Sequence, residues 1–241
     1  MKKKIIPVIL LAAVALGIFY KVRAGGDFRY SGTIEATEVD LSARIQGVIS
    51  SYGAREGEPV KKGQAVAALD CADLRLAAGL AQEDFARAAE LYKGGSMSRE
   101  NYDRARYKRD DSALKVDWCS IKSPVNGRLL YAYREAGELV GPGTKLATVA
   151  DLSEVWAYIY VPHDQLAKLK PGMDVNGFLP EAGDKSFPGR ISVIYSEAEF
   201  TPKNVQTRKE RTRLVFAVKV SFPNPDEMLK PGMTVEVKLP D

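Results

Sequence analysis

The chain has 241 residues, of which 45% are hydrophobic and 20 are glycine, and its formal net charge is +4. This composition is typical of an ordered, β-rich protein, and the basic residues are spread along the chain without forming a nucleic-acid-binding patch. One histidine, His163, and two cysteines are too few for a His/Cys metal cluster, and a catalytic triad would depend on that single histidine. We therefore expect a protein that is not an enzyme and that has no metal, no cofactor and no nucleic-acid partner.

The chain begins with a basic and then an apolar segment. Lys2–Lys4 precede an apolar run of 16 residues, Ile5–Tyr20, and further basic residues follow it. As a helix this run reaches about 24 Å, slightly less than a hydrocarbon core of about 30 Å. The basic flank predicts a cytoplasmic N-terminus and export of the rest to the periplasm. Residues 1–24 are therefore an inner-membrane anchor, which we favour, or a cleaved signal peptide.

A glycine-rich motif then occurs twice, at an offset of 80 residues. The two copies are Gly47, Gly57-Glu58-Pro59-Val60 and Gly63, and Gly127, Gly137-Glu138-Leu139-Val140 and Gly143. Each copy joins two short apolar runs by turns in which glycine supplies a positive φ or room for a close backbone approach. Neither copy can bury its apolar face alone, so we expect residues 40–70 and 119–150 to pair into one domain.

The segment over residues 72–118, between the two copies, has the pattern of helix, tight turn and helix. Apolar residues at coiled-coil spacing predict a seam along the first helix, formed by Leu74, Ala78, Ala81, Phe85, Ala88 and Tyr92. Gly94-Gly95 ends this helix, and Ser98 is predicted to be the N-cap of the second. The predicted stripe of the second helix is Tyr102, Ala105, Ala113 and Val116. Each leg has about 20 residues and is roughly 30 Å long.

Two cysteines lie at the base of this predicted hairpin. Cys71 follows the first glycine-rich copy, and Cys119 precedes the second. Export would bring both to a compartment where disulfides form. The sequence is equally compatible with a disulfide at the hairpin root and with two small buried thiols.

The remaining sequence is rich in predicted β-strands. Six candidates have alternating or continuous apolar residues, over 30–39, 155–161, 174–178, 187–194, 214–222 and 234–239. Six strands are enough to close a small barrel, which we assign to residues 28–39 and 151–241. The stretch 199–211 is predicted to be a polar loop.

Taken in this order, the chain resembles the HlyD-type membrane fusion proteins, which are periplasmic adaptors of bacterial export pumps. The matching segments are 43–47, 57–63, 69–70, 121–127 and 171–173, the last echoed at 231–233. The resemblance implies a mainly β fold with an α-helical hairpin. Its parts would be an N-terminal membrane segment, a split lipoyl-like (barrel-sandwich hybrid) domain, a short coiled-coil hairpin and a small β-barrel. It further implies a homo-oligomeric ring, commonly a hexamer, linking an inner-membrane transporter to a TolC-type outer-membrane channel.

Some hairpins of this family carry an R-x3-L-x6-S pattern near the tip, which is associated with contact to the outer-membrane channel. Arg87, Leu91 and Ser98 fit this pattern and lie on both sides of the Gly94-Gly95 turn. The resemblance therefore implies that these three residues contact the channel. Each also has an ordinary structural explanation, because Arg87 could be solvated, Leu91 could pack in the seam and Ser98 could cap a helix.

The expected transporter is of the ABC type. Adaptors of RND-type pumps usually carry another β domain after the barrel, whereas this chain ends at Asp241, and the segment 201–207 resembles ABC-exporter adaptors. The alternatives are an adaptor of another pump class and an envelope structural or binding protein unrelated to transport. A lipoyl- or biotin-carrying domain is excluded, because about fifty residues of helical pattern replace the turn that would present a modifiable lysine.

Overall fold

The computed structural model describes residues 28–183, 185–200 and 214–240. The expected membrane segment over 1–24 and most of the polar loop over 199–211 lie outside the described residues. Within the described ranges, no helix is both long enough and apolar enough to span a bilayer.

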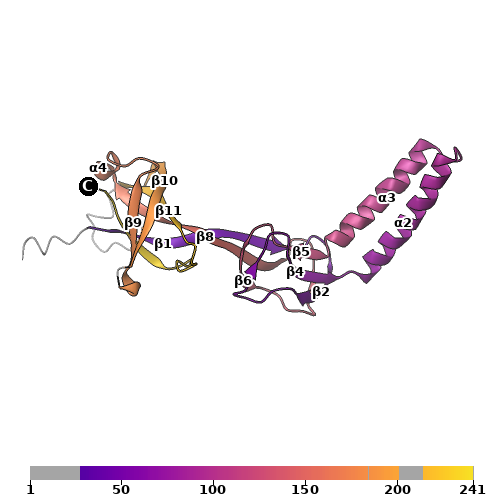
Figure 1. Cartoon of the computed structure of the whole chain (residues 1–241), viewed down its shortest axis with the longest axis horizontal. Coiled ribbons are helices and arrows are strands. Elements are labelled where there is room, and N and C mark those ends of the chain that lie inside the picture. The colour runs from indigo at the N-terminus through magenta and orange to yellow at the C-terminus, as the bar shows by residue number, and fades with distance from the viewer. Residues whose placement is uncertain (1–27, 184, 201–213, 241) are drawn as a thin grey trace, which may run out of the picture. The chain divides into compact units, whose positions relative to one another are not determined.

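The chain divides into two compact units (Figure 1). One comprises the residues up to Glu35, Trp156–Pro223 and Pro231 onward, and the other comprises Ala36–Val155 and Asn224–Lys230. Two long strands, β1 (Tyr30–Ser42) and β8 (Lys145–Pro162), contribute residues to both units. The expectation that the fold is mainly β with a helical hairpin is confirmed, since the described elements are strands apart from the hairpin and two short helical segments.

The first unit is a six-stranded barrel. Its strands are hydrogen-bonded in the order β1-β12-β9-β10-β11-β8, and β8 pairs back with β1. The strands not yet defined are β9 (Asp174–Leu179), β10 (Lys185–Phe200), β11 (Leu214–Pro223) and β12 (Thr234–Lys238). The short helix α4 (His163–Leu166) lies between β8 and β9, and η2 (Pro180–Ala182) lies between β9 and β10.

Alternate residues of β8 fill this barrel. Ala157, Ile159 and Val161 are fully buried, while the residues between them lie on the outer side, as expected for a strand with one face in a core. Phe222 is also fully buried. Glycines make room for its ring, since a Cβ at Gly177 or Gly189 would lie 2.6 or 2.5 Å from a Phe222 ring carbon.

The second unit contains the two glycine-rich copies, which pair crosswise. Gly47 of the first copy lies opposite Val140 of the second, and Val60 of the first lies opposite Gly127 of the second. The strands involved are β2 (Gly47–Tyr52), β3 (Pro59–Val60), β4 (Ala65–Asp70), β5 (Ser120–Lys122), β6 (Gly127–Ala132) and β7 (Leu139–Val140). Four of these strands form one sheet, in the order β5-β4-β2-β7. The other two pair with each other, and β6 also pairs with β8.

The offset of 80 residues is repeated in the backbone hydrogen bonds. Gly57 N donates to Leu129 O (2.7 Å), and its counterpart Gly137 N donates to Ile49 O (2.8 Å). Both glycines have a positive φ, 84° and 97°. The irregularity in strand register also recurs, after Ile49 in the first copy and after Leu129 in the second. Buried side chains of both copies belong to one hydrophobic core.

Several boundaries differ from those expected. The strand expected over 155–161 begins earlier, within the second glycine-rich copy, because no glycine or proline interrupts residues 145–161 of β8. Residues 36–39 and 151–155, expected in the barrel, belong to the second unit, and so do residues 224–230. Asn224 explains the position of this last segment, because its buried side-chain amide donates to Leu152 O and Leu229 O, both at 2.9 Å.

Candidate functional site: the helical hairpin and its tip

The hairpin consists of α2 (Ala72–Lys93) and α3 (Arg99–Asp117), which run side by side (Figure 1). Of the predicted seam of α2, Ala81 and Ala88 are buried and Leu74, Ala78 and Phe85 are half-buried, whereas Tyr92 at the last turn is 41% exposed. No residue of α3 is buried. The two legs therefore share a narrow contact that buries little apolar surface.

The predicted stripe of α3 is partly wrong. Tyr102, Ala105 and Val116 are half-buried as expected, but Ala113 is exposed. Arg109 faces α2 instead, with its guanidinium 4.0 Å from the ring centre of Phe85. Sequence periodicity excluded this residue because it is charged, yet a guanidinium over an aromatic face is a favourable seam contact.

Aromatic and charged side chains hold the two legs in register. The Tyr102 ring stacks on Tyr92 at 4.8 Å and lies 5.6 Å from Phe85. The Lys108 ammonium lies 3.7 Å from the Asp84 carboxylate. These contacts place Asp84 and Phe85 at the level of Lys108 and Arg109.

The turn between the legs is closed by backbone hydrogen bonds. Gly95 has φ 72°, Gly95 N donates to Tyr92 O (3.1 Å), and Ser96 N donates to Leu91 O (2.8 Å). This is the Schellman arrangement, which requires a residue with positive φ at the position of Gly95. Ser98 is the N-cap of α3, and its hydroxyl accepts a hydrogen bond from Asn101 N (3.3 Å).

The three candidate channel-contact residues are all exposed, at different heights. Leu91 is 48% exposed and lies outside the seam, and Ser98 is exposed on the other side of the turn. The Arg87 side chain is 62% exposed and pairs with Asp84 and Glu83 of its own helix. Because Arg87 precedes the end of α2 by six residues, it lies about 9 Å below the turn. Leu91 and Ser98 thus flank the tip, and Arg87 belongs to the outer side of α2.

Sequence reasoning missed an apolar line on the outer side of each leg. On α2, Leu76 and Leu80 are 77% and 56% exposed, and with Arg87 and Leu91 they fall within an arc of about 60°. On α3, Tyr107 and Leu114 are 72% and 49% exposed. The spacing of four residues between Leu76 and Leu80, and of seven between Tyr107 and Leu114, was a signal for these lines, but the stronger seam pattern masked it.

Cys71 and Cys119 form a disulfide at the hairpin root. Their Cα atoms are 6.3 Å apart, and both residues are buried. The bond joins the residue before α2 to the residue after the cap of α3, so it holds the ends of the two legs together.

Charged groups of the hairpin pair mainly within a leg. Near the root, the Lys115 ammonium lies 2.7 Å from Asp111. The hydrogen bond to that carboxylate and its negative charge raise the pKa of Lys115. In the part of the chain that the structure describes, no group of three or more His, Cys, Asp or Glu residues is placed to hold a metal ion.

The barrel matches a known domain family, and the whole chain matches known proteins. Residues 154–241 match the family described as CusB-like, beta-barrel domain. The chain is 24% identical to the membrane protein YbhG of Salmonella typhi, and the match covers 100% of the chain and 98% of YbhG. The alignment runs over 327 positions against the 241 residues of this chain, so YbhG contains residues for which this chain has no counterpart.

Solved structures share the fold. A MacA–MexA chimera containing the α-hairpin domain of Pseudomonas aeruginosa MexA superposes with a TM-score of 0.70, at 21% identity, covering 89% of this chain and 82% of the chimera. The membrane fusion protein Spr0693 of Streptococcus pneumoniae superposes with a TM-score of 0.61, at 19% identity, covering 89% and 99%. Barrel, lipoyl-like core and hairpin thus occur together in known proteins.

Proposed function

We propose that this chain, a relative of the non-catalytic membrane fusion and periplasmic adaptor proteins, links an inner-membrane exporter to a TolC-type outer-membrane channel. The observation that carries the proposal is the hairpin. It projects from a split lipoyl-like core, buries little surface of its own and presents Leu91 and Ser98 on either side of an exposed turn. An exposed turn of this kind suits docking against other helical hairpins.

The proposal assigns a role to each part of the chain. Residues 1–24 anchor the protein in the inner membrane, with the remainder in the periplasm. Residues 40–70 and 119–150 form the lipoyl-like domain, 72–118 the coiled-coil hairpin, and 28–35 with 156–223 and 231–241 the β-barrel domain. The exporter is of the ABC type, an assignment supported by the resemblance of segment 201–207. The CusB-like description of the barrel family makes another pump class the competing assignment.

Ring assembly is supported by the apolar lines on the outer sides of the hairpin. Because Phe85 is level with Arg109, and Tyr92 with Tyr102, Leu80 of α2 is level with Leu114 of α3. In a ring, the same two surfaces meet at every interface, so α2 of one copy would face α3 of the next at equal height. Leucine would then contact leucine across the interface.

Cysteine crosslinking tests the ring. Leu80→Cys combined with Leu114→Cys should give a ladder of disulfide-linked oligomers ending at the ring size, commonly six, when the transporter is present. The two positions lie on opposite outer sides of one hairpin, so a bond within one copy cannot form. Leu80→Cys alone is the control and should stop at dimers. Only monomers from the double variant would contradict the ring.

Charge reversal tests channel docking. Arg87→Glu should abolish export and photo-crosslinking from position 91 to the channel. Folding should be nearly unaffected, since substitution at an exposed position changes stability by no more than about 0.5 kcal/mol. Arg104→Glu is the matched control, because this arginine is 72% exposed, pairs with Glu100 four residues away and lies at a similar height on the other leg. Normal export by Arg87→Glu at a normal protein level would contradict the role of Arg87.

A further inference from the structure

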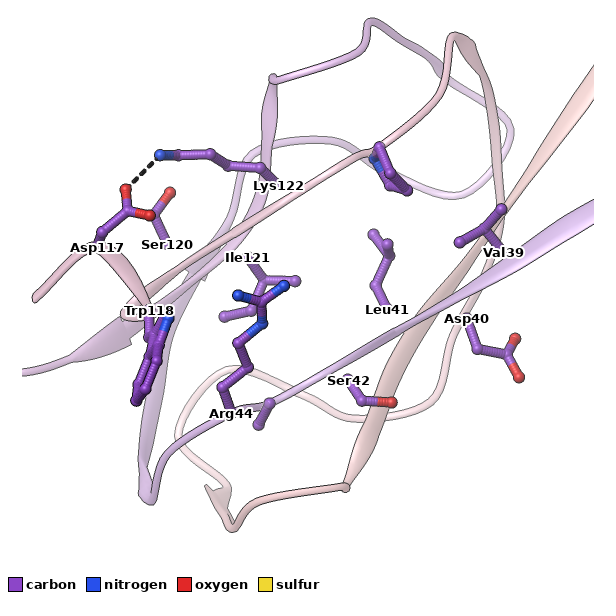
Figure 2. Close-up of a pocket in the computed structure, with 12 residues that line it drawn as sticks. Val39, Asp40, Leu41, Ser42, Arg44, Asp117, Trp118, Ser120, Ile121 and Lys122 are labelled. Carbon is purple, nitrogen blue, oxygen red and sulfur yellow. Dashed lines mark hydrogen bonds and ion pairs between the residues drawn. The ribbon is translucent and has the colours of Figure 1, made fainter. Parts of the chain in front are cut away.

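A pocket of about 400 Å³ lies in the second unit, between the end of β1 and the segment that contains β5 (Figure 2). Residues 39–44 form one wall, and residues 117–124 form most of the other. The pocket is distinct from the hairpin tip and from the outer sides of the legs, and the proposed adaptor function makes no use of it. Its volume is within the range of small-molecule sites, which begins at about 300 Å³.

The floor of the pocket is apolar and its side is aromatic. Leu41 and Ile121 belong to the hydrophobic core and are only 5% and 8% exposed, so the surface they present is fixed in place. Trp118 caps α3 and lines the pocket beside them. A small apolar body could therefore lie on a preformed surface next to an indole ring.

One positive charge in the lining is uncompensated. Lys122 pairs with Asp117 at 2.5 Å, and Asp40 pairs with Lys145 at 2.8 Å, so both acids of the lining are engaged. Arg44 has neither an ion pair nor a hydrogen bond to any residue that the structure describes. Figure 2 shows its guanidinium reaching into the pocket toward Ile121, between Trp118 and Leu41.

We infer that this pocket binds a small organic carboxylate with an aromatic or short aliphatic body. The planar guanidinium of Arg44 matches a carboxylate with two parallel hydrogen bonds. The body of the ligand would then lie over Leu41 and Ile121 and beside Trp118. This combination of an apolar surface with one converging charge is characteristic of ligand sites.

Trp118 can report binding in the full chain. The only other tryptophan, Trp156, belongs to the barrel unit, so Trp156→Phe leaves Trp118 as the sole indole. Benzoate is the probe, and benzamide, which has the same shape without the charge, is its control. We expect a saturable change in Trp118 fluorescence with benzoate and about tenfold weaker binding of benzamide, given the strength of charge-assisted hydrogen bonds.

Arg44→Gln should weaken benzoate binding by about tenfold for the same reason. Arg75→Gln, at another exposed arginine in the first turn of α2, should leave it unchanged. The inference is overturned if benzoate causes no saturable change, if benzamide binds equally well, or if Arg44→Gln binds benzoate like the parent. It is also overturned if Arg44→Gln impairs self-association but not benzoate binding, since Arg44 would then be an interface residue.

Discussion

The lipoyl-like core consists of two glycine-rich copies and the hairpin of two helical legs, but different interactions hold the two halves of each together. In the core, side chains of both copies such as Ile49 and Leu129 are almost completely buried, and backbone hydrogen bonds link the copies. In the hairpin, only Ala81 and Ala88 are buried, and aromatic contacts and a disulfide join the legs. The core is therefore stable through its own burial, whereas the hairpin depends on its root and leaves its outer sides available for partners.

Removing the disulfide should have the largest effect on stability, and it should affect the hairpin more than the core. Closing a loop over the 48-residue separation is worth about 4 kcal/mol in the chain-entropy account. Cys71→Ala with Cys119→Ala should lower the unfolding free energy of this unit by up to that amount. Hydrogen exchange should show hairpin amides losing protection before those of β2 and β6.

The parent protein under reducing conditions is the matched comparison and should behave like the double variant. Equal protection of hairpin and core amides in the double variant would contradict a hairpin that depends on its root.

The two glycines that open the repeats should differ in their tolerance of a methyl group, although the motif makes them equivalent. A Cβ at Gly127 would lie 2.1 Å from Ala150 O, whereas one at Gly47 would lie 3.3 Å from Asp70 O. Gly127→Ala should cost near the upper end of overpacking energies, about 3 kcal/mol, and Gly47→Ala about 1 kcal/mol or less. Urea unfolding measures both, and equal costs would show that the copies are packed alike.

A smaller effect on stability is expected from the charge of Asp40 in the second unit. Asp40 accepts hydrogen bonds from Lys145 and from Thr148 (2.7 Å), and these bonds hold the pKa of Asp40 below its usual value of 3.8. A carboxylate with a lowered pKa stabilises the fold above its unfolded-state pKa, and this contribution is lost as the pH falls through the folded-state pKa.

Asp40→Asn should therefore be less stable than the parent at pH 7, with the difference shrinking below about pH 4. Unfolding by urea at pH 7 and at pH 3 measures it. A difference that stays constant between these pH values would mean that the charge of Asp40 contributes nothing.

Part of the hairpin could be predicted because helices impose a strict period on the residues they bury. The turn at Gly94-Gly95, the cap at Ser98 and the α2 seam follow from local chemistry. Arg109 and Ala113 did not follow, because a period assigns positions by hydrophobicity alone and cannot foresee a guanidinium stacked on Phe85. The exposure of Leu91 likewise depended on the rotation of α2 about its axis, which is set by contacts with α3.

By itself, the sequence determined the β-rich class, the helical hairpin and the offset of 80 residues between the glycine motifs, because turns, caps and periodic burial are properties of neighbouring residues. Tertiary structure alone decided the crosswise pairing of β2 with β7 and of β3 with β6, and the transfer of residues 224–230 to the second unit. It also brought Arg44 and Trp118 to one pocket. These features depend on contacts between residues distant in sequence, and no local pattern encodes which distant surface a side chain meets.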